Sequence, residues 1–140
     1  MIVLDTSVVL AAMNDRDDDY ELARTWMESQ HEQLVCTPLV VAELDHVVLA
    51  LAGRAAARSL REDIERGAYQ LEWWSTAIHE TVTVANRYEA MDLGLTDASL
   101  VALAARLQTT HIATLDERHF RTLKPLYGSE TFTLFPADAG

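Results

Sequence analysis

The N-terminal stretch of the chain reads Ile2-Val3-Leu4-Asp5-Thr6-Ser7, and the prediction of the fold starts from it. Three apolar residues in a row are too few for a helix and predict a short buried strand. An acid and two hydroxyl residues follow at once, and the apolar segment 8–13 then predicts a helix that Thr6 or Ser7 caps. A buried strand that runs directly into a helix is typical of a parallel α/β fold.

The same alternation of strand and helix continues along the chain. Further strands are expected over 34–36, 69–74, 111–115 and 131–135, and helices over 20–30, 38–52, 54–66, 76–91 and 97–108, the last capped by Thr96. This order implies right-handed crossovers and a mainly parallel sheet of four or five strands, covered by helices on both faces. The length of 140 residues fits one domain, which we expect to span residues 1–140.

The charge of the chain bears on its partners. There are 22 acidic residues against 11 Lys and Arg, for a formal net charge of −11. Because phosphate backbones attract basic surfaces, this balance argues against a protein that binds nucleic acid regardless of sequence. It still allows a protein whose acids hold a cation that meets the phosphate.

Cysteine content and hydropathy exclude other classes. The single cysteine, Cys36, excludes an internal disulfide framework and a Cys-rich zinc site. The N-terminal apolar run is interrupted by Asp5 and lacks a basic leader, and no charge-free stretch is long enough for a membrane span. We therefore expect a cytoplasmic protein that makes no membrane contact.

Two carboxylates follow predicted strands. Asp5 and Asp116 each come after a buried strand, and ligands of open α/β sheets bind outside the carboxyl ends of the strands. Aspartate is also a common residue of strand-to-helix turns, so each of them taken alone has a purely structural explanation.

Two further carboxylates lie on predicted helices. Glu43 has apolar neighbours three, four and seven residues away, which predicts a buried carboxylate in need of a cation. The alternative is a glutamate at the edge of the apolar stripe, bonded to backbone or to a partner subunit. Asp97 opens its helix, where an acid taken alone is often only a capping residue. Because Thr96 already offers a cap and apolar residues share its face, Asp97 is expected to point toward the same interior. Four carboxylates at one sheet edge would form an oxygen-rich site suited to Mg²⁺ or Mn²⁺, which can activate water against a phosphodiester.

Four segments, taken in order, resemble the PIN domain and in particular the VapC ribonuclease toxins of type II VapBC toxin–antitoxin modules. The segments are Ile2–Ser7, Val40–Leu44 around Glu43, Thr96–Ala104 with Asp97, and Ile112–Phe120 with Asp116. The resemblance covers nearly the whole chain. It implies a three-layer α/β/α sandwich.

The resemblance also implies a function and a site. Asp5, Glu43, Asp97 and Asp116 would bind Mg²⁺ or Mn²⁺: Asp5 and Asp97 as principal ligands, Asp116 completing the site, and Glu43 holding the metal through water or orienting the attacking hydroxide. Members of the family hydrolyse single-stranded or loop regions of RNA, often tRNA or ribosomal RNA, and so stop translation. The resemblance further implies that three hydroxyl residues support the site by hydrogen bonding: Thr6, Ser7 and Thr114.

The implied partners are a second copy of the chain, in a homodimer, and a VapB-type antitoxin, in a toxin–antitoxin hetero-oligomer. The C-terminal arm of that antitoxin would cover the catalytic groove, where an Arg would meet the carboxylates.

The sequence leaves the roles of three residues and two alternative functions open. Arg118 and His119 would contact substrate phosphate or simply lie on the surface, and Asp92 is expected to have a loop role. One alternative function is an RNA-processing PIN nuclease without an antitoxin. Another is a non-catalytic PIN module that binds protein or RNA. An aspartyl phosphotransferase using Asp5 is disfavoured, because Ser7 stands where a second Asp is expected.

Overall fold

The computed structural model describes residues 1–139 and contains a five-stranded sheet. Its strands are β1 (Ile2–Leu4), β2 (Leu34–Cys36), β3 (Gln70–Leu71), β4 (His111–Ala113) and β5 (Thr133–Phe135). They lie in the order β3-β2-β1-β4-β5, and every neighbouring pair is parallel. The prediction of a mainly parallel sheet is confirmed.

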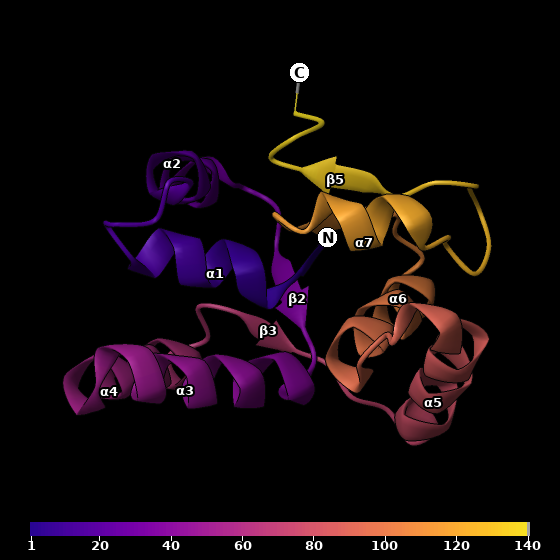
Figure 1. Ribbon diagram of the computed structural model, residues 1–140, viewed down its shortest axis with the longest axis horizontal. Coiled ribbons are helices and arrows are strands. Elements are labelled where there is room, and N and C mark those ends of the chain that lie inside the picture. Colours follow the sequence, from indigo (N-terminus) through magenta and orange to yellow (C-terminus); the bar gives the residue numbers. More distant parts are fainter. Residues whose placement is uncertain (140) are drawn as a thin grey trace.

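Helices connect the strands and lie on both sides of the sheet. They are α1 (Thr6–Met13), α2 (Tyr20–Ser29), α3 (Pro38–Ala52), α4 (Arg54–Glu65), α5 (Ala77–Arg87), α6 (Leu95–Leu107) and α7 (Glu117–Thr122), with the 3₁₀ turn η1 (Glu89–Met91). Figure 1 shows α1 and α2 on one side of β2 and β3, and α3 with α4 on the other. The predicted α/β class with helices on both faces is confirmed. Within residues 1–139, none of the helices combines the length and the apolarity that crossing a membrane requires.

Several boundaries differ from the prediction. The third strand covers two residues instead of six, and the predicted helix over 76–91 is divided into α5 and η1. The segment that follows Asp116 forms α7, which the sequence analysis left without a helix. Short edge strands and single-turn helices carry too little periodicity to be recognised from one sequence.

The predicted caps of two helices are wrong. The helix α1 already begins at Thr6, so Asp5 holds the N-cap position, and neither Thr6 nor Ser7 caps the helix. Likewise α6 begins at Leu95 after Gly94, so Thr96 lies inside the first turn. In both places the expected capping residue lies within the helix, and of these hydroxyls Ser7 Oγ instead makes contacts at the end of the sheet.

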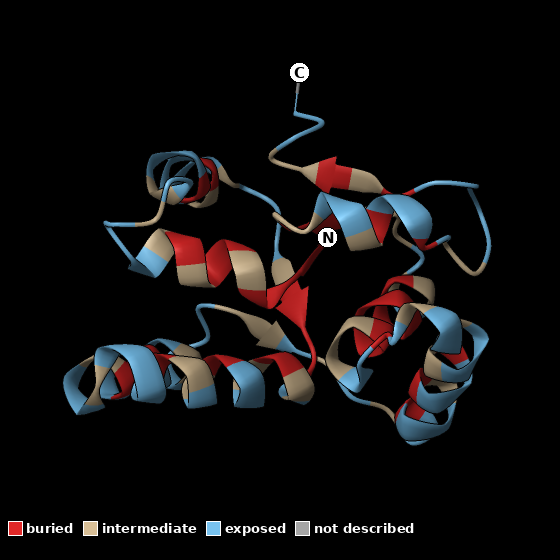
Figure 2. Cartoon of the chain, viewed as in Figure 1, coloured by how far each residue is buried: buried red, intermediate tan, exposed pale blue. Residues whose placement is uncertain are grey.

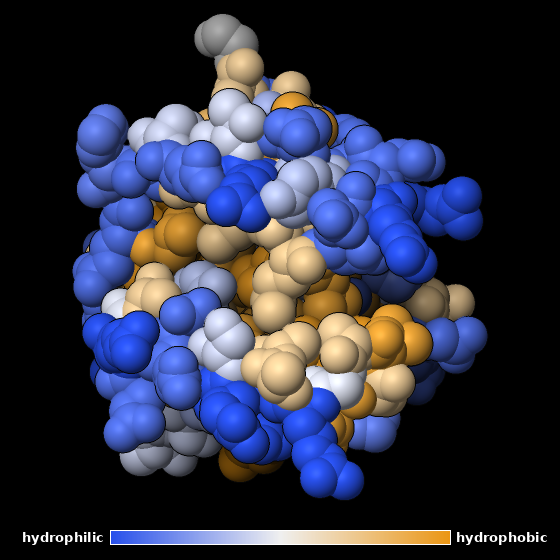
Figure 3. Space-filling model, turned by 90° about the vertical axis from the view of Figure 1, so that its left-hand side faces the viewer, coloured by the Kyte–Doolittle hydropathy of each residue, from blue (hydrophilic) through white to orange (hydrophobic). Residues whose placement is uncertain are grey.

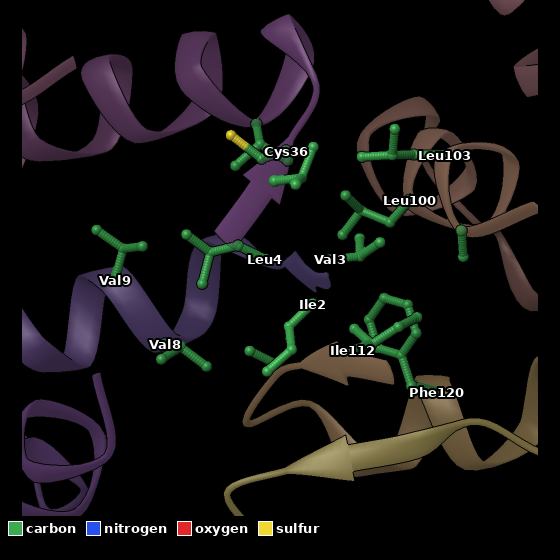
Figure 4. Close-up of a cluster of buried hydrophobic side chains, with 14 of the residues drawn as sticks. Ile2, Val3, Leu4, Val8, Val9, Cys36, Leu100, Leu103, Ile112 and Phe120 are labelled. Carbon is green, nitrogen blue, oxygen red and sulfur yellow. The ribbon is translucent and has the colours of Figure 1, made fainter. Parts of the chain in front are cut away.

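The core lies around β1, which is buried along its whole length (Figure 2). Its side chains alternate between the two faces of the sheet: Val3 points toward Leu100 of α6, and Leu4 points toward Val8 and Val9 of α1 (Figure 4). The helix α6 is also central, since it is buried continuously from Ala98 to Ala104. A sheet held by apolar packing on both faces gives a rigid platform for side chains at its edge.

The strand order determines where a ligand site should form. The chain proceeds from β1 to β2 and β3 on one side of the sheet, then crosses to β4 and β5 on the other. In open parallel sheets, the crevice at such a reversal, outside the carboxyl ends of the strands, is the usual ligand site. Here the reversal lies between β1, which ends next to Asp5, and β4, which leads to Asp116.

Candidate active site

A cleft of about 310 Å³ opens at this reversal. All four acids that the sequence analysis selected line it: Asp5, Glu43, Asp97 and Asp116. The other lining residues are Thr6, Ser7, Leu10, Gly94, Leu95 and Thr96. The cleft thus brings together the end of β1, the first turns of α1 and α6, the loop after β4, and one residue of α3.

Asp5 lies deepest in the cleft and is only 4% exposed. Its Oδ2 accepts hydrogen bonds from Ser7 Oγ at 2.7 Å and from Thr114 Oγ1 at 2.8 Å. Burial raises the pKa of the Asp5 carboxyl above its ordinary value, and the two hydroxyl donors partly offset that rise. The hydroxyls therefore fix the carboxylate in place without supplying a positive charge.

The same two hydroxyls also hold the loop after β4. Leu115 N–H donates to Ser7 Oγ and Asp116 N–H donates to Thr114 Oγ1, each at 2.9 Å. The resemblance implied such support from Ser7 and Thr114, and the hydrogen bonds are present. Thr6 differs, because its buried Oγ1 has no hydrogen-bond partner among residues 1–139.

Asp97 lies in the first turn of α6 with its side chain 22% exposed. Its pKa is raised to about 6, first by burial and then by the negative charge of Asp5, with Asp116 adding a smaller repulsion. His119 acts in the opposite direction and lowers it. The carboxylates of this cleft therefore carry more negative charge than their protein surroundings balance.

His119 is the functional candidate that sequence reasoning left undecided. Asp116 is the N-cap of α7 and accepts a hydrogen bond from His119 N–H at Oδ1, 3.2 Å away. The His119 ring contacts two of the carboxylates that line the cleft, with Nδ1 3.1 Å from Asp116 Oδ2 and 3.2 Å from Asp97 Oδ2. One feature of the sequence could have indicated this contact. Asp116 and His119 are three residues apart, which is the spacing of an N-cap and the third residue of its helix.

Comparison of the sequence with known proteins identifies a family. The family model of the PIN domain matches residues 2–124. Ribonuclease VapC26 of Mycobacterium tuberculosis is 34% identical over 136 residues, which cover 96% of this chain and all of that protein. This chain belongs to the VapC family of PIN domains.

Solved structures agree on the fold of this PIN domain. VapC20 of Mycobacterium tuberculosis, described as a toxin that cleaves the sarcin–ricin loop, superposes with a TM-score of 0.76 at 17% identity, covering 83% of this chain and 90% of that one. VapBC2 of Rickettsia felis, bound to a DNA fragment from its promoter, gives a TM-score of 0.67 at 17% identity, covering 96% and 99%. A toxin–antitoxin complex of Klebsiella pneumoniae gives 0.66 at 14% identity, covering 94% and 100%.

Glu43 occupies the rim of the cleft in this PIN domain, and the expectation that it is buried is wrong. The side of α3 that packs on the core carries Val40, Leu44 and Val48, and Glu43 is exposed. The helix is apolar nearly all round, so sequence alone did not show which side packs inward. Glu43 needs no cation to offset burial, but it still lines the same cleft as the three aspartates.

Two other residues lie away from the carboxylates. Arg118 is exposed on α7, one residue before His119, and does not line the cleft. Asp92 is exposed in the loop after η1, where it adopts a left-handed conformation with φ of 53°. The expected loop role of Asp92 is confirmed.

The donor atoms of this cleft fit a divalent cation. One ligand atom from each of Asp97, Asp116 and His119 lies within 4.8 Å of the other two, and Asp5 lines the same cleft wall. Carboxylate oxygens are the ligands that Mg²⁺ and Mn²⁺ prefer. Within the described chain, the residues that line the cleft include no Lys or Arg to balance their charge.

Proposed function

We propose that this protein is a Mg²⁺- or Mn²⁺-dependent endoribonuclease toxin of a type II toxin–antitoxin module. It would hydrolyse RNA phosphodiester bonds in the cytoplasm, in tRNA or ribosomal RNA loops, and so stop translation. The observation that carries this proposal is the convergence of Asp5, Asp97 and Asp116, with Glu43 at the rim, in one cleft at the sheet reversal. The identity with Ribonuclease VapC26 over nearly the full length of both chains supports the reaction type.

Each acid would have a distinct role in this reaction. Asp5, Asp97 and Asp116 would hold the ion, which neutralises phosphate charge and activates a water when bound. Asp5 is locked by two hydroxyl donors, so it would hold its oxygens in one geometry throughout the reaction. Glu43 is exposed at the rim of the cleft, which suits a carboxylate that accepts a proton at its side-chain oxygens from the attacking water.

The substrate would be recognised by its shape more than by charge. With 22 acids and 11 bases, the surface repels an RNA backbone except where a bound ion meets it. Such a protein would cut RNA where a loop brings a single phosphate into the cleft. It would not bind along the backbone of double-stranded RNA. VapC20, which has the same fold, is described as a toxin that cleaves the sarcin–ricin loop.

The partner that would restrain this activity is a VapB-type antitoxin. An apolar groove lined by Leu10, Met13, Val47, Val48 and Leu51 adjoins the acidic cleft, because Leu10 lines both. Figure 3 faces the side of the molecule where α1 and α3 end, and shows apolar surface in a hollow between hydrophilic rims. An amphipathic antitoxin arm would bury its apolar side in this groove and extend a basic residue to the carboxylates.

The homodimer that the resemblance implies stays part of this proposal. Large apolar side chains remain exposed on the isolated chain, among them Leu49 of α3 and Ile78 and Val82 of α5. Sedimentation of the purified toxin would report the oligomeric state directly.

The proposal is tested by inducing the protein briefly in cells and sequencing the 5′ ends of their RNA. Wild-type protein should generate new 5′ ends at a small number of loop positions, and Asp97→Asn should generate none at equal expression. The proposal predicts a small reading frame beside the gene, and co-expression of its product should abolish the new ends. Growth arrest without new RNA ends would overturn the nuclease and favour a binding module, whereas cleavage that no neighbouring reading frame suppresses would favour an RNA-processing enzyme.

A further inference from the structure

We propose that His119 supplies a nitrogen ligand to the divalent ion held by Asp97 and Asp116, so that this cleft prefers Mn²⁺ to Mg²⁺. The inference rests on the proposed function and deepens it. It concerns a residue to which the acidic pattern of the chain gave no metal role.

The spacing of the three donor atoms supports this assignment. His119 Nδ1 lies 3.1 Å from Asp116 Oδ2 and 3.2 Å from Asp97 Oδ2. In an octahedral site with bonds of about 2.0–2.1 Å, adjacent ligands lie about 2.9 Å apart. The imidazole nitrogen therefore has the separation from both carboxylates that adjacent ligands of one ion would have, with a slight expansion.

The fold holds the ring in this position. Asp116 uses Oδ1 to accept the His119 N–H at the start of α7, which leaves Oδ2 facing the imidazole. The next residue, Phe120, is 1% exposed and anchors α7 in the core. Because the helix start and the buried Phe120 both constrain His119, its ring is oriented before any ion binds.

The surrounding charge leaves room for a cation beside this histidine. One imidazole faces two carboxylates, and Asp5 and Glu43 line the same cleft as both of them, so even a protonated ring would leave negative charge in excess. When a divalent ion replaces the proton between the ring and the carboxylates, the neutral imidazole, with its remaining proton on Nε2, would offer the lone pair of Nδ1 as a ligand. Imidazole binds transition metals well, whereas Mg²⁺ selects oxygen, so this nitrogen should shift the preference toward Mn²⁺.

Pulsed electron paramagnetic resonance of the Mn²⁺-loaded protein provides the test. The bound Mn²⁺ should show coupling to a directly ligated ¹⁴N, and the coupling should change to that of ¹⁵N when only the histidines are ¹⁵N-labelled. His119→Gln should abolish the coupling and weaken Mn²⁺ binding by about tenfold or more in calorimetry, with a smaller effect on Mg²⁺. The control is His79→Gln, an exposed position on α5 outside the cleft, which should retain both the coupling and the affinity.

The possible failures are distinguishable. Mn²⁺ that binds the wild-type protein without nitrogen coupling, or with equal affinity in His119→Gln, would overturn the role of His119 and leave the carboxylate site standing. Wild-type protein that binds neither Mn²⁺ nor Mg²⁺ would overturn the proposed metal-dependent nuclease as well. The labelling experiment needs no substitution, and circular dichroism melting curves verify that the variants are folded.

Discussion

Thr114 and Asp5 lie 109 positions apart in the sequence and are joined by a buried hydrogen bond of 2.8 Å. Thr114 Oγ1 also accepts the backbone N–H of Asp116 at 2.9 Å. One hydroxyl therefore connects the carboxyl end of β1 to the loop that carries the next acid. Hydrogen bonds from uncharged donors thus hold the Asp5 carboxylate near the loop of Asp116. No Lys or Arg lines this part of the described chain to balance the two acids.

Replacing Thr114 tests this connection. Thr114→Val should destabilise the fold by about 1–3 kcal/mol, because the buried Asp5 carboxylate loses one of its two hydroxyl donors and the Asp116 N–H loses its acceptor. RNA cleavage should fall as Asp5 and Asp116 lose their fixed positions, and Thr114→Ser should restore most of both. Urea unfolding and a cleavage assay measure the two effects. Thr83→Val is a suitable control, since this exposed hydroxyl bonds only the His79 carbonyl of its own helix; equal effects at the two positions would contradict the role of Thr114.

The raised pKa of Asp97 predicts an unusual dependence of stability on pH. The folded-state pKa is about 6 against an ordinary value of 3.8, so between these values the folded protein retains a proton that the unfolded chain has released. In EDTA, the free energy of unfolding should therefore fall as pH rises from about 4 to about 6, by at most about 3 kcal/mol. Asp97→Asn should lack this fall and be the more stable protein above pH 6. Parallel pH profiles for the two proteins would refute the raised pKa of Asp97.

A substitution at Glu43 should change the rate of RNA cleavage without changing the stability of the fold. Because it is exposed, Glu43→Gln should change the free energy of unfolding by no more than about 0.5 kcal/mol. Its cleavage rate should nevertheless fall by about 10²–10⁴-fold if the carboxylate accepts the proton of the attacking water. Glu62→Gln, on the exposed side of α4, should cleave at the wild-type rate. Undiminished cleavage by Glu43→Gln would remove this residue from the reaction.

The apolar groove beside the cleft should bind the antitoxin. Leu51 is 84% exposed in that groove, and Leu51→Glu should weaken neutralisation by the antitoxin about tenfold or more while leaving RNA cleavage intact. Leu22→Glu is the matched control, because Leu22 is 52% exposed on α2 but does not line the groove. Titration of antitoxin into a cleavage assay measures both variants. Neutralisation that is equal for both would place the antitoxin elsewhere.

The sequence predicted the sheet and the acids that line the cleft, for identifiable reasons. The apolar run Ile2–Leu4 and the acid directly after it specify a buried strand and the residue at its carboxyl end, so the position of Asp5 made it a candidate for a site at that edge of the sheet. Asp116 was selected in the same way, because it comes shortly after the buried strand β4. The expectation of one domain over residues 1–140 stays a prediction.

Other features depend on packing, which one sequence does not reveal. The burial of Glu43 was misjudged because α3 is apolar nearly all round and only tertiary contacts select Val40, Leu44 and Val48 as its inner side. The place of His119 depends on α7, a six-residue helix whose start is specified by the Asp116 side chain and not by hydrophobic periodicity. Short elements of this kind are determined by their surroundings more than by their own residues.

The central claim is that the carboxylates of this cleft cut RNA through a divalent ion. The most direct measurement incubates purified wild-type protein and Asp5→Asn with a synthetic RNA that contains the mapped loop, in Mn²⁺, in Mg²⁺ and in EDTA. Wild-type protein should cut the loop with either ion and stop in EDTA, and Asp5→Asn should be at least about 10²-fold slower than wild type with either ion. Cleavage that persists in EDTA, or that Asp5→Asn carries out at the full rate, would contradict the claim.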